Sequence, residues 1–377
     1  MAVDLLDIIS IVTVFQLLLL AIFLIGHKKG NRISNRILSV FLFSNALLIA
    51  NFILFRLKIL TFDSFSYISF IGRSSYFLLM PLLYLYTRSL CYRNFALKKM
   101  DLLHLLPFAI SVSFLIIQFN VRAALISEGP TVPPKATTPY GEFIFSGALH
   151  TQILLYIIAT LQTLRIYRSE LKKLFSSVEH IDLSWLLFLL IAFVLMWIID
   201  VTNFVLSITK TAPKGTHYIM NLISLTINFI FATVIVYRGL KQPETFSGIE
   251  EKPKYTKQKL SASDSEQYVK QLTSYMESQK PYLAPSLSLN DLAWKMAMSS
   301  RLLSQVINES MNQNFFDFVN SYRIEEAKRI FLDPSSHRKT VLEVLYDVGF
   351  NSKSVFNSAF KKHTGMTPTR FKKLHKV

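Results

Sequence analysis

The sequence of 377 residues is poor in cysteine, in charged residues and in acids. Its single cysteine, Cys91, excludes a disulfide framework and a cysteine-based zinc site. Only 17% of the residues are charged, whereas soluble domains carry about 25%. Acids number 24 against 41 Lys and Arg, so the net charge is +17. Because 51% of the residues are hydrophobic and 13% aromatic, the chain is not disordered. An apolar and basic composition indicates a membrane together with an anionic partner.

The apolar residues are concentrated before residue 240, where only ten acids occur. Seven segments there are long and apolar enough to cross a hydrocarbon core of about 30 Å: about 5–26, 36–56, 66–90, 101–120, 142–164, 184–207 and 217–237. Seven such segments in a row leave no polar face for water, which argues against buried helices of a soluble protein. The fold we predict is all-α: a seven-transmembrane helix bundle over 1–240, a linker over 241–263 and a cytoplasmic all-α domain over 264–377.

The loops between these segments differ in basic residues, and this difference predicts orientation because Lys and Arg accumulate in cytoplasmic loops. The first, third and fifth loops hold twelve: Lys28, Lys29, Arg32, Arg36, Arg88, Arg93, Lys98, Lys99, Arg165, Arg168, Lys172 and Lys173. The other three hold six: Arg56, Lys58, Arg122, Lys135, Lys210 and Lys214. The N-terminus is therefore expected outside and everything after Arg238 inside. The start, Met1 to Asp7, has two acids and no base, unlike a signal peptide.

Three ionisable residues lie in the interior of the predicted spans, away from the span ends: Arg73, His150 and Asp200. Such residues are costly in a bilayer and are candidates for function. At 1.5 Å per residue all three fall roughly 10–12 Å below the outer surface. Equal depth suits a shared site that senses a small-molecule or protein signal. It equally suits a structural ion pair between Arg73 and Asp200. Pro81 in the third span is expected to kink it.

The C-terminal part reads as short helices with clear start signals, such as Ser299 and the capping box of Thr340 and Glu343. Two pairs, 289–309 and 340–363, have helix-turn-helix proportions and are joined by a helix over about 315–332. Such a motif places its second helix in the DNA major groove. The predicted outward positions of the second helices are Ser300, Arg301, Ser304, Gln305, Ser352, Lys353, Asn357 and Ser358. Such side chains suit contacts with bases or phosphates, although each could also be a solvated surface residue.

No acidic residue follows Asp347, so the end of the chain is strongly positive. This charge suits neutralisation of DNA phosphates, and Lys361 and Lys362 are added to the predicted DNA contacts. Binding to anionic lipid is the alternative, but a lipid-binding segment would lie next to the last span. The basic residues are Lys353, Lys361, Lys362, Arg370, Lys372, Lys373 and Lys376.

Residues 281–377 resemble the DNA-binding domain of the AraC/XylS-type transcription regulators. The resemblance implies two helix-turn-helix units held by a rigid central helix, reading successive major grooves on one face of DNA. Where that family usually has Gly after the first recognition helix, this chain has Asn312, which also tolerates positive φ. The segments that carry the resemblance are 287–293, 298–305, 315–323, 326–328, 348–361 and 365–371. The first half resembles the membrane-bound subgroup by architecture.

These observations predict a membrane-anchored transcription regulator of a bacterial inner membrane that senses a signal through its spans. Its DNA-binding domain is expected to bind promoter DNA either at the membrane or after proteolytic release. An integral-membrane enzyme or transporter with a basic lipid- or protein-binding tail is the alternative. No catalytic residue, metal site or cofactor is predicted. A homodimer is a candidate assembly, although no heptad seam is present.

Overall fold

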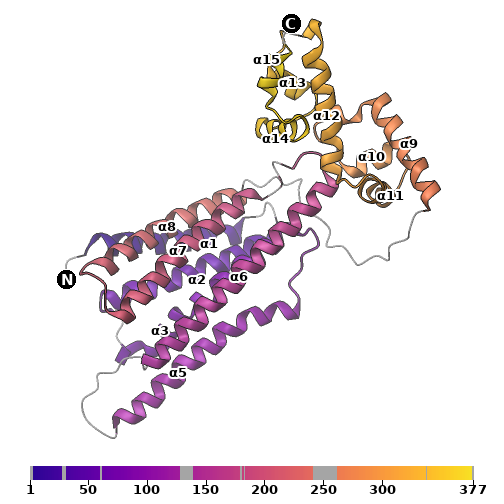
Figure 1. Ribbon diagram of the computed structural model, residues 1–377. Helices are drawn as coiled ribbons and strands as arrows, with labels where there is room; N and C mark the ends of the chain where they lie inside the picture. Colours follow the sequence, from indigo (N-terminus) through magenta and orange to yellow (C-terminus); the bar gives the residue numbers. More distant parts are fainter. Residues whose placement is uncertain are drawn as a thin grey trace. The chain divides into compact units, whose positions relative to one another are not determined.

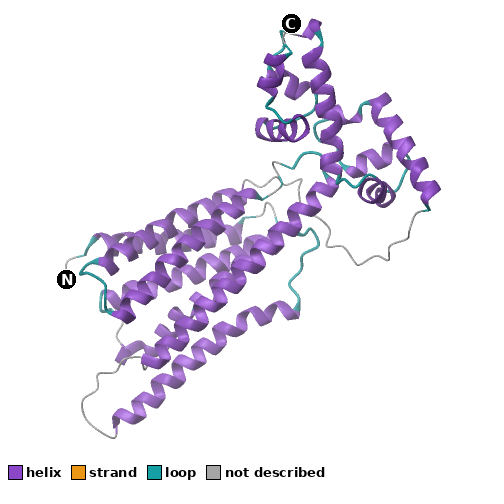
Figure 2. Ribbon diagram, in the orientation of Figure 1, coloured by secondary structure: helices purple, strands orange, loops and turns teal. Residues whose placement is uncertain are grey.

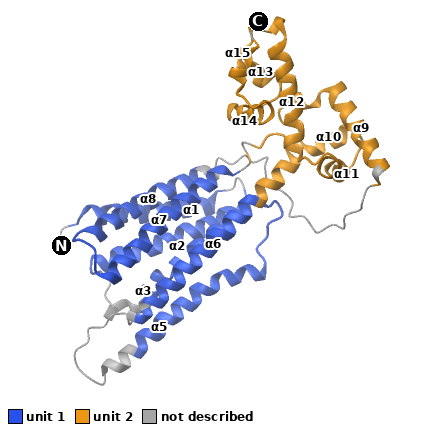
Figure 3. Ribbon diagram, in the orientation of Figure 1, with its two compact units in different colours: residues 1–165, 183–251 blue, residues 166–182, 252–377 orange. Residues whose placement is uncertain are grey.

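The computed structural model describes residues 3–27, 31–59, 62–127, 139–178, 181, 183–240, 261–336 and 338–375. Helices dominate this part of the chain and no strand occurs in it, as predicted; Phe175 and Ser288 form an isolated antiparallel bridge (Figure 2). The chain divides into two compact units. The first contains residues 1–165 and 183–251, and the second contains 166–182 and 252–377 (Figure 3).

The first unit is built from long apolar helices (Figure 1). Seven helical segments among the described residues are long and apolar enough to cross a membrane, the number predicted. They are α1 (Leu5–Gly26), α2 (Arg32–Arg56), α3 with α4 (Phe62–Ser74 and Tyr76–Cys91), η1 with α5 (Lys99–Leu105 and Leu106–Ser127), α6 (Pro139–Leu174), α7 (Ser184–Thr209) and α8 (Thr216–Leu240).

The third of these segments is interrupted at Ser75, between α3 and α4, and Pro81 lies inside α4. A proline has no backbone N–H, so the carbonyl four residues earlier has no partner within the helix. That carbonyl, of Phe77, accepts a hydrogen bond of 3.0 Å from Nε2 of Gln152 on α6. A side chain from a neighbouring helix therefore satisfies the backbone at Pro81.

Polar side chains connect the helices of the first unit. Helix α1 packs against α2 and α8, α2 against α4, and α7 against α8. Arg56 at the end of α2 forms ion pairs with Asp4 and, at 2.7 Å, with Asp7 at the start of α1. Asn45 of α2 and Asn228 of α8 exchange hydrogen bonds of 2.9 and 3.3 Å. These contacts fix the α1, α2 and α8 faces against one another.

The second unit consists of shorter helices that follow the predicted pattern. Residues 241–260 of the predicted linker lie outside the described residues, and α9 begins at Ala262. The elements are α9 (Ala262–Gln279), η2 (Pro281–Leu283), α10 (Leu289–Lys295), α11 (Ser300–Gln305), η3 (Val306–Ser310), α12 (Phe315–Leu332), η4 (Pro334–Ser336), α13 (Val341–Asp347), α14 (Lys353–Thr364) and α15 (Pro368–Leu374).

Helix α12 joins two separate hydrophobic clusters in this unit. Its first half, with Phe315, Phe318 and Val319, packs with α9, α10 and α11. Its second half, with Ile324 and Ala327 among others, packs with α13, α14 and α15. The pairs α10–α11 and α13–α14 therefore form two helix-turn-helix units mounted on one central helix.

Caps and turns begin and end these helices largely where the sequence predicted. The Ser299 side chain caps α11, and Thr340 with Glu343 forms the predicted capping box of α13. Asn312 adopts a φ of 52°, the left-handed conformation expected at that position. Ser352 is the N-cap residue of α14, but its side chain makes no capping hydrogen bond.

Candidate nucleic-acid interface and a cavity among the apolar helices

The first helix-turn-helix unit presents α11 as its second helix. Arg301 is exposed, whereas Ser300, Ser304 and Gln305 are half-buried. Gln305 donates to Oε2 of Glu309 at 2.9 Å, and Ser304 accepts 2.6 and 3.1 Å hydrogen bonds from Asn308 at its backbone and hydroxyl oxygens. Arg301 is thus the most accessible of the four predicted positions.

The second helix-turn-helix unit presents α14, whose predicted positions are more exposed. Lys353, Ser358, Lys361 and Lys362 are exposed, and Ser352 and Asn357 are half-buried. Phe356, Ala359 and Phe360 fill the opposite face and pack in the second cluster. This division gives α14 a polar outer face and an apolar inner one, as a recognition helix needs.

The turn between α13 and α14 depends on Gly349. Its φ is +89°, and a Cβ added there would lie 2.7 Å from the carbonyl oxygen of Leu283 and 2.8 Å from that of Tyr282. Only glycine combines this backbone conformation with so close an approach. Gly349 thereby allows the second helix-turn-helix unit to pack closely against η2.

One predicted DNA contact is already paired within the protein. Nζ of Lys362 lies 2.9 Å from Oδ1 of Asp317, in the first turn of α12. The pair connects α14, in the second helix-turn-helix unit, to the central helix α12. Lys361, one residue earlier, is exposed and shows no such ion pair among the described residues. The two neighbouring lysines therefore differ in the charge they offer to DNA.

Arg323 of α12 is a structural residue that the sequence pattern did not single out. It is 1% exposed and lies between the two clusters. Its Nε donates to the Tyr282 carbonyl at 2.7 Å and its Nη2 to the Ala284 carbonyl at 2.8 Å, while its guanidinium lies over the Phe350 ring. Its signal in the sequence is its spacing, four residues after Val319 and four before Ala327, which places a charge on the buried face.

Arg323 also binds residue Ser176, which belongs to the segment that follows α6. Nη1 donates to the Ser176 carbonyl at 3.3 Å and Nη2 to its hydroxyl at 3.2 Å. Ser176 in turn donates to the Leu287 carbonyl through its N–H at 3.2 Å and its hydroxyl at 2.6 Å. Leu174 packs against the first cluster, and Nζ of Lys172 lies 5.7 Å from the centre of the Phe316 ring. Residues 166–182 are therefore an integral part of the second unit.

Glu326, one turn after Arg323, gathers three donors. Lys280 Nζ lies 2.8 Å from Oε1, and the Tyr282 hydroxyl and Arg329 each lie 3.3 Å from Oε2. Partial burial alone would raise the pKa of Glu326, but the hydrogen bond and charge of Lys280, helped by Arg329, hold it below its ordinary value. Burial and the neighbouring Glu326 carboxylate raise the pKa of Tyr282 to about 12.

Comparison with known proteins agrees with this geometry. Residues 292–374, which include both helix-turn-helix units apart from the start of α10, match the family described as a helix-turn-helix domain. The C-terminal part of the chain is an AraC-type helix-turn-helix domain. No solved structure matches the chain significantly.

The relatives of the AraC-type domain are transcriptional regulators. The Msm operon regulatory protein of Streptococcus mutans is 28% identical over 30% of this chain and 38% of its own length. A regulator in the cgkA 5′ region of Pseudoalteromonas carrageenovora is 31% identical over 23% of this chain and 49% of its own. The regulator YdeC of Bacillus subtilis is 33% identical over 24% of this chain and 30% of its own. The chain thus spans less than half the length of each relative, and the likeness concerns the AraC-type domain.

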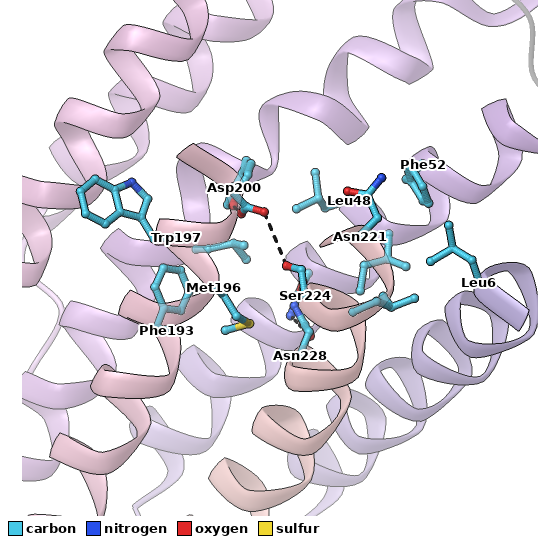
Figure 4. A pocket seen from close by; sticks show the side chains of 15 residues that line it. Leu6, Leu48, Phe52, Phe193, Met196, Trp197, Asp200, Asn221, Ser224 and Asn228 are labelled. Carbon is cyan, nitrogen blue, oxygen red and sulfur yellow. Dashed lines mark hydrogen bonds between the residues drawn. The ribbon is translucent and has the colours of Figure 1, made fainter. Parts of the chain in front are cut away.

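A second candidate site is a cavity in the first unit, of about 240 Å³ (Figure 4). Asp200 of α7 lies at it and accepts hydrogen bonds from the hydroxyls of Tyr76 and, at 3.5 Å, Ser224. The cavity is lined by residues of α1, α2, α4, α7 and α8: Leu6, Asn45, Leu48, Ile49, Phe52, Tyr76, Leu79, Phe193, Met196, Trp197, Asp200, Asn221, Ser224, Leu225 and Asn228.

The other two ionisable residues that the sequence places in predicted spans, His150 and Arg73, do not line this cavity. The indole N–H of Trp197, a lining residue, donates to Nδ1 of His150 at 3.2 Å. The Arg73 guanidinium lies 4.6 Å from the centre of the Phe145 ring. Among these described side chains, the alternative Arg73–Asp200 ion pair is not formed, because Tyr76 and Ser224 occupy the carboxylate. No pattern in the sequence predicts Tyr76 as the partner of Asp200.

Proposed function

We propose that this protein is a membrane-anchored, sequence-specific DNA-binding transcription regulator that senses a signal through its seven apolar helices. The AraC-type domain and its regulator relatives support the DNA-binding part. The signal is a small molecule or a protein that acts on the first unit. In this account the protein is not an enzyme.

The observation that carries the proposal is the course of helix α6. Its 36 residues correspond to about 54 Å, well beyond the roughly 30 Å of a hydrocarbon core. Phe143–Leu174 qualifies as a candidate span, yet Leu174 packs in the first cluster of the AraC-type domain and Ser176 binds Arg323. One helix is thus both a candidate membrane span and a part of the DNA-binding unit, which favours a regulator that binds DNA while anchored.

The surface of the first unit supports membrane anchoring. Large apolar side chains are heavily exposed along its helices, for example Phe15 at 67%, Ile22 at 70% and Phe188 at 65%. Contiguous apolar surface of this kind is rare on soluble monomers, whereas lipid tails would cover it. The surplus of Lys and Arg in the first, third and fifth loops favours an N-terminus outside and the AraC-type domain in the cytoplasm.

In the DNA-bound protein, α11 and α14 enter successive major grooves. Ser300, Arg301, Ser304, Gln305, Ser352, Lys353 and Asn357 supply base or phosphate contacts, and Lys361 and Lys362 supply positive charge to the backbone. Both helices pack on α12, so the distance between them is already set in the protein without DNA. A homodimer on paired sites is compatible with this arrangement.

Topology is tested first, by labelling single cysteines in intact cells with a membrane-impermeant maleimide. The native Cys91 is buried and gives little background. Lys214→Cys, in a loop proposed to be outside, should be labelled, and Lys99→Cys, in a loop proposed to be inside, only after lysis. The reverse pattern would contradict the proposed orientation.

DNA binding is tested by isolating the membrane fraction of cells and mapping the genome-wide DNA sites that the full-length protein in this fraction occupies. Discrete promoter sites bound by a membrane-fraction protein support the proposal. A protein that fractionates with membranes and occupies no specific sites would instead favour an enzyme or transporter with a basic tail.

A further inference from the structure

We propose that the intramembrane cavity binds a small organic monocation, with its ammonium group against Asp200 and its apolar part among the aromatic side chains. This inference rests on the proposed sensing function and names the chemical class of the signal.

The sign of the charge follows from the lining. Asp200 is the one acidic residue among the described lining residues, and none of those residues is Lys, Arg or His. Its hydrogen-bond partners, Tyr76 and Ser224, are neutral hydroxyls. A carboxylate in apolar surroundings is costly unless an opposite charge compensates it. A cation in the cavity would provide that compensation, whereas an anion would be repelled.

The protein's own nearby cations are committed elsewhere. Arg56 at the end of α2 forms ion pairs with Asp4 and Asp7. Arg73 lies over the Phe145 ring, and His150 accepts the indole N–H of Trp197. The counter-charge for Asp200 is therefore not one of these described side chains.

Asparagine side chains offer the acceptors that an ammonium group also needs. Asn45 and Asn228 bond to each other, and Asn221 accepts from Asn203 at 2.9 Å. An amide oxygen has two lone pairs, so each of these oxygens can accept a second hydrogen bond. Figure 4 shows Asn221, Ser224 and Asn228 lying along the same side of the cavity, on α8.

The remaining walls suit the apolar part of such a ligand. Phe52, Phe193 and Trp197 line the cavity together with Leu6, Leu48 and Met196 (Figure 4). Aromatic faces attract cations as well as burying hydrocarbon, with Trp the strongest. A cavity of about 240 Å³ has room for an alkyl- or arylalkylammonium ion but not for a large drug-sized molecule.

The test uses the purified full-length protein in detergent micelles with three probes of matched shape: 2-phenylethylammonium, the neutral 2-phenylethanol and the anionic phenylacetate. Binding is read from the rise in unfolding temperature, because a ligand of the folded state stabilises it by mass action. We expect a saturable rise with the ammonium ion and none with the other two at the same concentration. This comparison on the unmodified protein needs no variant to fold.

The variant Asp200→Asn should weaken ammonium binding at least tenfold, while Glu266→Gln on α9, which removes an exposed carboxylate in the other unit, should leave it unchanged. Equal binding of the alcohol, or wild-type ammonium affinity in Asp200→Asn, would overturn the inference.

Promoter affinity, measured in the same preparations with and without the ammonium probe, separates this inference from the proposed function. Intact promoter binding without any ammonium binding would overturn the ligand class alone. Saturable ammonium binding that depends on Asp200 would support the ligand class. If promoter affinity did not change when the probe bound, the ligand class would stand but the sensing function would be contradicted.

Discussion

Nη2 of Arg323 lies 3.2 Å from the hydroxyl oxygen of Ser176, a residue 147 positions earlier in the chain. Both residues are 1% exposed. The contact joins the segment after α6 to α12, the central helix of the second unit.

Removing either partner of this contact should destabilise the second unit. Arg323→Met would leave the carbonyls of Tyr282, Ala284 and Ser176 without their donor and should cost about 3 kcal/mol or more, because each buried unsatisfied group costs about 1–3 kcal/mol. Ser176→Ala should cost about 1 kcal/mol. Denaturant unfolding of the full-length protein, followed by a reporter in the AraC-type domain, measures both. Ser354→Ala, exposed on α14, is the control and should have little effect.

The two glycines that flank α14 should respond differently to alanine. Gly349→Ala meets carbonyl oxygens at 2.7 and 2.8 Å, so backbone strain and a clash add up to a loss of more than about 2 kcal/mol. Gly365 also has a positive φ, but nothing lies within 4 Å of its added Cβ, so Gly365→Ala should lose only about 1–2 kcal/mol. Equal losses in thermal unfolding would show that the close approach to η2 is unimportant.

Lys361 and Lys362 should differ in their contribution to DNA affinity. Lys362 is paired with Asp317, whereas Lys361 is exposed, so Lys361→Ala should reduce the salt dependence of promoter binding by about one phosphate contact. Lys362→Ala should reduce it less. Binding titrations at several salt concentrations give the slope for each variant, and a larger change for Lys362→Ala would refute this assignment.

Glu326 should make the stability of the second unit sensitive to acid. Its pKa is depressed in the folded protein, so its pairing with Lys280 stabilises fully above the ordinary value of 4.5 and is lost as the pH falls below it. The difference in unfolding temperature between the wild type and Glu326→Gln should therefore be largest near neutral pH and shrink below pH 4.5. Glu325→Gln, which removes the more exposed neighbouring acid, should show a smaller difference.

The sequence predicted the architecture well because its signals are local. Runs of apolar residues predicted seven long apolar helices that are candidate spans, and caps such as Thr340 with Glu343 predicted the starts of the short helices. The positive φ at Asn312 followed from residue chemistry in the same way.

Contacts between segments that are distant in the chain could not be predicted from the sequence. In the sequence Ser176 is an ordinary polar loop residue, and its role follows only from its contact with Arg323 of α12. The partner of Asp200 is Tyr76, because these residues of α7 and α4 lie next to each other in the fold. The paired state of Lys362 likewise depends on where α12 begins relative to α14. Side-chain partners of this kind are set by packing, which no local pattern encodes.

The central claim is that α11 and α14 read DNA while the protein remains in a membrane. The most direct measurement is promoter binding by the full-length protein in lipid vesicles, with wild type, Arg301→Ala, Lys353→Ala and the control Lys270→Ala, which alters an exposed lysine on α9. Arg301→Ala and Lys353→Ala should each lose about 1–3 kcal/mol, roughly 5- to 150-fold in affinity, and Lys270→Ala should match the wild type. Unchanged promoter affinity in both recognition-helix variants would contradict the account.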